Sequence, residues 1–199
     1  DEETLAQYRA RRRRQKRSSA GGAAQMRRLE AVTRDGQPCV LQGNIETRDD
    51  ITLVQEFGGV GVGLFRTEFL YLGRDEPPDE EMQVAEYSEA AAALEGEILT
   101  IRTMDFGGDK FDRRQNQMGE ANPFMGERAI RVSLKHGDFF LVQLKAILRS
   151  GLNGRVQMMF PMIMDVGEFR QALSVVEKAR GELRDAGIPF DEEMKIGAM

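Results

Sequence analysis

Short apolar runs alternate with helix-like segments from residue 30 onward, and this alternation limits the possible folds more than any other feature of the chain. The apolar runs predict strands over residues 40–45, 61–65, 97–102, 155–163 and 195–199. The segments between them predict helices over residues 47–56, 79–94, 122–131, 139–150 and 165–186, the first of them capped by Thr47. Strands that alternate with helices favour parallel βαβ units. Nearly continuous apolar strands suit a sheet that is covered on both faces or closed into a barrel.

The composition limits the class of protein. The 199 residues include 41% hydrophobic side chains, enough for one domain with its own core. No apolar run approaches the roughly 20 residues that a membrane span needs. The single cysteine, Cys39, cannot form an internal disulfide, so we expect a reducing compartment. The chain starts at Asp1 without an initiator Met, so we expect it to begin inside a longer protein.

Positive charge is concentrated near the N-terminus. The net charge of the chain is −5, whereas residues 1–28 contain nine Lys or Arg and three acidic residues, a balance of +6. Most of this charge lies in the block Arg9–Arg17. Such a block can contact nucleic acid. The interpretation that we favour is a solvated linker helix, over residues 1–29, that joins two domains.

Two arginines stand at the C-terminal ends of neighbouring predicted strands. Arg66 and Arg102 are each followed by Thr, and each lies where an apolar run stops. The C-terminal ends of parallel strands share one face of a barrel. Both guanidinium groups can therefore reach one anion, whose carboxylate or phosphate oxygens they match in a bidentate way. The structural alternative is a local ion pair, for example of Arg66 with Glu68 or of Arg102 with Asp105.

Two glycine-rich segments invite a nucleotide or phosphate interpretation. The polar stretch 106–121 predicts a long loop, and within it Gly107-Gly108-Asp109-Lys110 can bring backbone and a lysine charge close to a phosphate. A tight turn explains the same four residues equally well. The segment Gly58–Gly63 imitates a dinucleotide fingerprint, but its glycines precede a strand, so we reject that motif.

Little in the sequence suggests metal or acid–base chemistry. His136 is the only histidine, and it lies where a helix is predicted to end. We interpret it as a helix cap, where a cation favours the dipole, and not as a catalyst. Cys39 precedes the first predicted strand, away from the arginines. No cluster of His, Cys or carboxylate residues has the spacing of a metal site.

Three long motifs resemble enzyme I of the bacterial phosphotransferase system, the phosphoenolpyruvate-protein phosphotransferases. They are GVGLFRTEFL at residues 61–70, RTMDFGGDK at 102–110 and NPFMGERAIR at 122–131. Two shorter segments also fit, MFPM at residues 159–162 and KIGAM at 195–199. The resemblance implies an α/β fold, a partial (βα)8 TIM barrel over residues 30–199 that follows the N-terminal linker helix. The barrel would comprise about the first four βα units and a fifth strand.

The same resemblance implies a function for the parent protein. In that family, the phosphoryl group of phosphoenolpyruvate passes to a histidine on an upstream domain and then to the phosphocarrier protein HPr for sugar uptake. By the motifs they occupy, Arg66, Arg102 and Arg128 look like substrate-binding arginines, and Lys110 lies in a matching motif. The resemblance also implies Mg²⁺ in the full-length parent, a cytoplasmic location and a homodimer.

Several family motifs have no counterpart in this chain. These are the phosphohistidine motif, the metal-binding Glu and Asp, and the acidic cysteine that protonates the enolate. We therefore expect a fragment without catalytic residues or metal ligands of its own, inactive when alone. The alternatives are a pyruvate phosphate dikinase or phosphoenolpyruvate synthase, a nitrogen-related paralogue with a regulatory role, and a basic nucleic-acid-binding fragment. We expect no membrane partner, and we expect nucleic-acid binding less than the phosphotransferase role.

Overall fold

Five parallel strands in a single sheet form the centre of the molecule. The computed structural model describes residues 29–74, 76–106 and 128–199. Within them the strands are β1 (Gly43–Ile45), β2 (Val62–Arg66), β3 (Ile98–Arg102), β4 (Arg155–Phe160) and β5 (Lys195–Ala198). They lie side by side in chain order, and every neighbouring pair is parallel. The predicted α/β fold with parallel βαβ units is confirmed. Closure of the sheet into a barrel stays a prediction.

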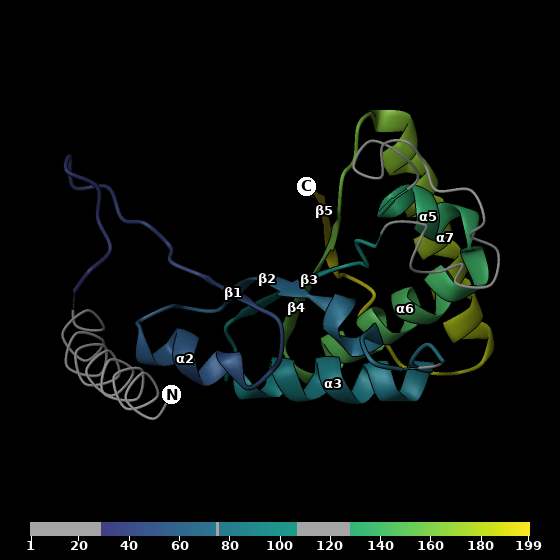
Figure 1. Ribbon diagram of the computed structural model, residues 1–199, viewed down its shortest axis with the longest axis horizontal. Coiled ribbons are helices and arrows are strands. Elements are labelled where there is room, and N and C mark those ends of the chain that lie inside the picture. Colours follow the sequence, from purple (N-terminus) through teal and green to yellow (C-terminus); the bar gives the residue numbers. More distant parts are fainter. Residues whose placement is uncertain (1–28, 75, 107–127) are drawn as a thin grey trace, which may run out of the picture.

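Helices connect the strands and pack on one side of the sheet (Figure 1). They are α2 (Asp50–Glu56), α3 (Glu80–Ala93), α5 (Ile130–Lys135), α6 (Gly137–Ser150) and α7 (Val166–Asp185), with the short 3₁₀ turns η1 (Thr67–Tyr71) and η2 (Gly151–Asn153). Helix α3 packs against α6, and α6 packs against α7. Helices α3, α6 and α7 therefore form a continuous layer along the sheet.

Capping side chains explain where two of the long helices begin. Asp79 accepts a hydrogen bond from the backbone N–H of Met82 at the start of α3, and Asp165 accepts one from Glu168 at the start of α7. A carboxylate in this position satisfies a free backbone donor and favours the helix dipole. Both starts agree with the sequence prediction to within one residue.

The predicted cap of the first helix was wrong. Thr47 precedes α2, but its hydroxyl does not cap the helix. The carboxylate of Asp50, inside the first turn, instead accepts hydrogen bonds from the backbone N–H groups of Glu46 and Thr47 at 3.1 and 3.0 Å. These two bonds lower the pKa of Asp50, because they stabilise its charged form. Asp50 thereby holds the short connection between β1 and α2.

Three predicted boundaries also differ from the structure. The first strand begins at Gly43 instead of residue 40, and Val40 before it is exposed. The fourth strand ends at Phe160, and Met162 takes a left-handed backbone with φ of 55°. Such a conformation interrupts an extended strand. Helix α5 starts only at Ile130, whereas most of the predicted helix 122–131 lies outside the described residues.

The two faces of the sheet differ in chemistry. Phe65, Leu99 and Ile101 are fully buried, and Phe65 packs edge-on against Tyr87 of α3 with ring centroids 6.1 Å apart. Side chains alternate between faces along a strand, so Arg66 and Arg102 point away from the helices. Arg66 and Arg102 are also register partners in the parallel pairing of β2 and β3. Both arginines therefore project from the same face of the sheet, at neighbouring strand ends.

Close contact between the strands supports this register. Gly61, just before β2, has φ of +110°, and a Cβ atom there would lie 2.7 Å from the carbonyl oxygen of Ile98. Any larger side chain would push β2 away from β3.

None of the described helices is long and apolar enough to span a membrane. The predicted linker helix, including Arg9–Arg17, lies outside the described residues.

Candidate anion-binding site

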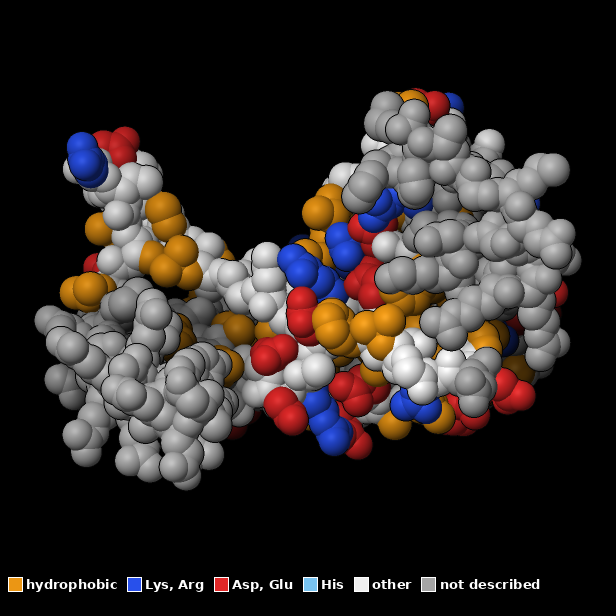
Figure 2. Space-filling view, viewed as in Figure 1, with side chains coloured by type: hydrophobic (Ala, Val, Ile, Leu, Met, Phe, Trp, Pro, Cys, Tyr) orange, Lys and Arg blue, Asp and Glu red, His pale blue; other side chains and the backbone are white. Residues whose placement is uncertain are grey.

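Three arginines gather at the C-terminal ends of β2 and β3. Arg66 ends β2, Arg102 ends β3, and Arg128 precedes α5. Carboxylates lie between them, and we call the six residues Arg66, Arg102, Arg128, Glu46, Glu68 and Asp105 the arginine site. Figure 2 shows basic and acidic side chains next to one another in the hollow of the molecule. The structure thus brings together the three described arginines that the sequence singled out, while Lys110 lies outside the described residues.

Arg66 is the most accessible of the three arginines. Its Nη1 atom lies 3.2 Å from Oε1 of Glu46, and the two side chains are 43% and 46% exposed. An ion pair this exposed stabilises a protein by about 0–1 kcal/mol. An incoming anion can therefore replace Glu46 at small cost. The alternative pairing of Arg66 with Glu68 is wrong, because Glu68 binds Arg102.

Arg102 is held from two sides. Its Nη2 atom lies 3.0 Å from Oε1 of Glu68 and its Nη1 atom lies 3.1 Å from Oδ2 of Asp105, with all three side chains only 11–12% exposed. The backbone N–H of Asp105 also donates to Oε1 of Glu68 at 2.7 Å. Low exposure and two charged partners fix the direction of the guanidinium group. The alternative prediction of an Arg102–Asp105 pair is confirmed.

Asp105 connects the second and third arginines. Its Oδ1 atom lies 3.0 Å from Nη2 of Arg128, while Oδ2 contacts Arg102. The backbone N–H of Ala129, next to Arg128, donates to the carbonyl of Phe106 at 2.8 Å. The chain on either side of residues 107–127 therefore meets at the site. Arg102 and Arg128 belong to one hydrogen-bonded group although they lie 26 positions apart in the sequence.

Two donors of this group have no partner among the described residues. The Nε atoms of Arg102 and Arg128 are buried and make no hydrogen bond there. A buried donor without an acceptor costs free energy, typically about 1–3 kcal/mol. Both atoms belong to side chains that already contact the same carboxylate. An oxyanion that binds at this site can accept hydrogen bonds from unsatisfied donors of this kind.

The charges of the arginine site balance. Three guanidinium groups face three carboxylates, so the site as it stands has no net positive charge. Of the three carboxylates, Glu46 is the easiest for an anion to displace because it is the most exposed. The observed pairing pre-orients Arg102 and leaves Arg66 able to turn toward a ligand.

The described residues do not offer a magnesium site. They contain no group of three or more His, Cys, Asp or Glu side chains that could hold a metal ion. Glu68 and Asp105, the carboxylates nearest the arginines, are engaged by guanidinium groups. His136 lies between α5 and α6 as the residue that ends α5, and Cys39 is exposed.

Two contributors to the arginine site were not predicted. Glu46 follows β1 in the sequence Ile45-Glu46-Thr47, which parallels Phe65-Arg66-Thr67 after β2. This repeated pattern of an apolar strand followed by a charged residue and Thr would have identified it. Gln143 of α6 lies behind the site and is fully buried. Its helical spacing from Phe140 and Ile147 would have placed it on the buried face of α6, but the sequence does not show which groups it contacts.

Comparison with known proteins agrees with this architecture. The family model of the PEP-binding domain of PEP-utilising enzymes, where PEP is phosphoenolpyruvate, matches residues 20–199. The phosphoenolpyruvate-protein phosphotransferase of Staphylococcus aureus strain MSSA476 is 41% identical over 175 residues, which are 88% of this chain and 31% of that protein. The protein of the same name from Priestia megaterium is 42% identical over 170 residues, 85% of this chain and 30% of that protein.

A third relative gives the same result. The phosphoenolpyruvate-protein phosphotransferase of Haemophilus influenzae strain Rd is 40% identical over 176 residues, 88% of this chain and 31% of that protein. The chain thus spans about a third of the length of these curated relatives. Because the family model matches residues 20–199, this chain belongs to the PEP-utilising enzymes and contains their PEP-binding domain.

Proposed function

We propose that this chain is the part of a phosphoenolpyruvate-protein phosphotransferase that holds the phosphate of phosphoenolpyruvate. The observation that supports this most is the arginine site, where Arg66 and Arg102 project side by side from neighbouring parallel strands. Guanidinium forks match phosphate oxygens. Positive groups fixed around a phosphoryl group offset its charge and hold it in line for transfer.

The residues of the site have distinct parts in this proposal. Arg102, fixed by Glu68 and Asp105, provides a guanidinium group in constant orientation. Arg66 exchanges Glu46 for the substrate phosphate. Arg128, which is oriented by Asp105, adds a third guanidinium group. Lys110 is proposed as a further phosphate contact on the strength of its motif alone. The carboxylates set the directions of the arginines and yield to the ligand.

Steps beyond phosphate binding need groups from elsewhere in the parent protein. We propose that the phosphoryl group passes to a histidine outside this chain and then to HPr for sugar uptake in the cytoplasm, within a homodimer. Mg²⁺ would be held by ligands outside the described residues. The named relatives favour this proposal over a dikinase, a synthase or a nitrogen-related paralogue, because they share the phosphotransferase name at 40–42% identity. We therefore propose residues 30–199 as barrel and 1–29 as linker, and no turnover by the chain alone.

Isothermal titration with phosphoenolpyruvate tests the proposed function. Replacing Arg66 or Arg102 by Ala should weaken binding at least about tenfold, because each removes a charge-assisted contact worth roughly 1.5–3 kcal/mol. Arg184→Ala is the matched control, since Arg184 is 50% exposed and also pairs with one carboxylate, Glu192, outside the site. Equal affinity for all three variants and the parent chain would contradict phosphate binding at the arginine site.

A further inference from the structure

A single buried amide reaches both strand ends that bear the paired arginines. Gln143 of α6 is completely buried. Its Nε2 donates to the hydroxyl of Thr67 at 3.1 Å, and its Oε1 accepts from the backbone N–H of Met104 at 3.0 Å. Thr67 follows Arg66 directly, and Met104 lies two positions after Arg102 and directly before Asp105. One side chain from the helix layer therefore joins the segments that leave β2 and β3.

Thr67 extends this connection to Arg102 itself. Its hydroxyl donates to the carbonyl oxygen of Arg102 at 3.0 Å while it accepts from Gln143. The next residue after Met104 is Asp105, whose backbone N–H holds Glu68 and whose carboxylate holds Arg102 and Arg128. A shift of the amide of Gln143 would therefore reach the arginine site by two routes, through Thr67 and through Met104.

The remaining hydrogen bonds fix the direction of the amide. Nε2 of Gln143 also donates to the hydroxyl of Tyr87 at 3.3 Å, and Tyr87 donates to Oε1 of Gln83 at 3.1 Å. Burial raises the pKa of Tyr87 and of Tyr71, so both phenols stay neutral donors at ordinary pH. Every donor in this series of hydrogen bonds thus has one acceptor. Reversing the Gln143 amide would place its NH₂ group against the N–H of Met104 and its oxygen against the accepting side of the Thr67 hydroxyl.

We infer that Gln143 is a positioning residue for phosphate binding. It sets the distance between the segments that follow Arg66 and Arg102. This inference rests on the proposed function and deepens it, since Gln143 contacts no ligand. A glutamine suits the position because it alone among residues of this length offers a neutral donor and a neutral acceptor to two loops at once. A carboxylate there would be buried beside Thr67 and Tyr87 with no amide to donate.

Replacement of Gln143 by Met separates this role from a general contribution to stability. Methionine fills a similar volume without hydrogen bonds. The matched control is Gln83→Met, because Gln83 is an equally buried glutamine of the same network that contacts Tyr71, Tyr87 and Pro78 but neither Thr67 nor Met104. Thr67→Val is a milder second variant, which removes only the hydroxyl between Gln143 and Arg102.

The first measurement is amide hydrogen exchange in the 199-residue chain, followed by NMR. In Gln143→Met, exchange at Met104 and Asp105 should speed up about tenfold relative to Ile101, because one hydrogen bond that holds them is lost. In Gln83→Met, the two amides should keep their rates relative to Ile101. Equal acceleration in both glutamine variants, or none in Gln143→Met, would overturn the inference.

The second measurement is the affinity for phosphoenolpyruvate by calorimetry. Gln143→Met should bind about tenfold more weakly, Thr67→Val should fall between it and the parent, and Gln83→Met should bind like the parent, because displaced contact groups lose affinity steeply. Unchanged affinity in Gln143→Met would overturn the inference even if exchange accelerates. If Arg102→Ala binds like the parent, the proposed function fails instead, and the exchange rates still decide whether Gln143 holds the two loops.

Discussion

Arg66 and Arg102 are the same residue type at equivalent strand positions, yet their surroundings give them different properties. Arg102 has two carboxylate partners and is 11% exposed, whereas Arg66 has one partner and is 43% exposed. Removing Arg102 would leave Glu68 and part of Asp105 without a counter-charge at low exposure, which is costly. Affinity measurements on Arg102 variants therefore need a parallel measurement of stability, while those on Arg66 variants report on binding almost alone.

Asp50 gives a prediction about pH. Hydrogen bonds from Thr47 and Glu46 lower the pKa of Asp50 below its ordinary value of 3.8, so its contribution to stability is present above that value. The contribution is lost as the pH falls through the lowered pKa of the folded state. Asp50→Asn should therefore lower the free energy of unfolding near neutral pH, by less than about 1 kcal/mol because solvent screens this carboxylate, and by progressively less below about pH 4.

Urea unfolding of the parent chain and Asp50→Asn across this pH range is the measurement. Asp49→Asn is the control, because the side chain of Asp49 makes no capping hydrogen bond. A constant difference between parent and Asp50→Asn down to acid pH would refute the role given to this carboxylate.

Sequence reasoning reached the arginines but not the groups that orient them. Arg66 and Arg102 stood out because a charge at the end of an apolar run needs a partner, whereas Arg128 stood out only through the family motif that it occupies. The actual partners followed from tertiary contacts, since Arg66 pairs with Glu46 from the neighbouring strand end and Glu68 turns to Arg102. Gln143 could not be identified, because its role depends on two loops that are 76 and 39 residues away.

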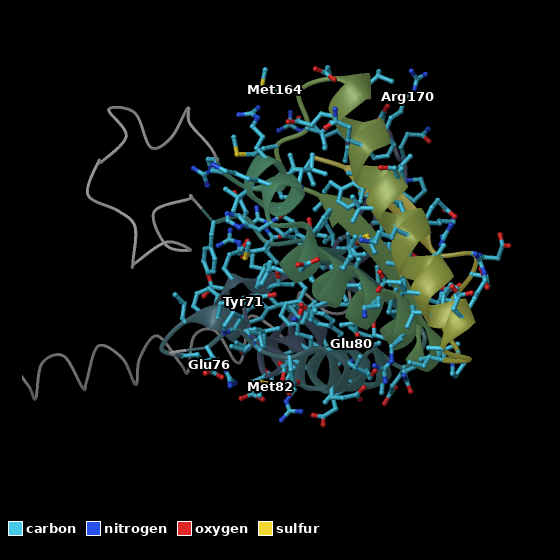
Figure 3. The ribbon with its side chains drawn as sticks, turned by 90° about the vertical axis from the view of Figure 1, so that its right-hand side faces the viewer. Tyr71, Glu76, Glu80, Met82, Met164 and Arg170 are labelled. Carbon is cyan, nitrogen blue, oxygen red and sulfur yellow. The ribbon has the colours of Figure 1, made fainter. Side chains whose placement is uncertain are left out.

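At the scale of elements, charged side chains join the helices at the end of the layer away from Met164 (Figure 3). Glu80 at the start of α3 contacts Lys145 at 3.0 Å and Arg149 at 2.6 Å, both on α6. Arg149 also contacts Glu81 at 2.7 Å, and Lys145 reaches Glu182 of α7 at 3.5 Å. This group links three helices through their side chains, in addition to the apolar contacts between them.

Arg149→Ala should lower the free energy of unfolding by about 1 kcal/mol at low ionic strength, since the side chain is only 17% exposed and has two partners. The difference should shrink in about 1 M salt, because screening acts over roughly 3 Å there. Urea unfolding at both salt concentrations measures it. Arg184→Ala, from an exposed pair, should change the stability little at either concentration, and an equal effect of both variants would contradict a special role for the three-helix group.

Element boundaries followed from sequence where a local signal set them. Helices α3 and α7 begin at carboxylate caps, which are visible as Asp79 and Asp165 before an apolar pattern. The end of β4 depends instead on the left-handed backbone of Met162, a residue type that rarely adopts it. No local sequence rule predicts a left-handed backbone at a methionine.

At the scale of the whole molecule, the parallel order of the strands was evident from their alternation with helices. Closure of the sheet into a barrel was not evident from this alternation, because closure depends on more than the described strands. Within the described residues, β1 and β5 each pair with one neighbour only. Unpaired strand edges favour association with another chain.

We therefore predict that the chain self-associates. Sedimentation velocity over a wide range of protein concentration should show a growing fraction of dimer or larger species. Screening by salt should not abolish this association, because backbone hydrogen bonds and apolar contacts drive it. A compact monomer at every concentration would count against the prediction.

The pairing of Arg66 with Arg102 also limits how this protein can vary in length. Successive residues of a strand face opposite sides, so one residue inserted or deleted within Ile98–Arg102 would turn Leu99 and Ile101 outward and bury a guanidinium group among apolar helices. Homologues should accordingly tolerate gaps in the connections between strands and helices, while the number of positions from Gly61 to Arg66 and from Ile98 to Arg102 stays constant.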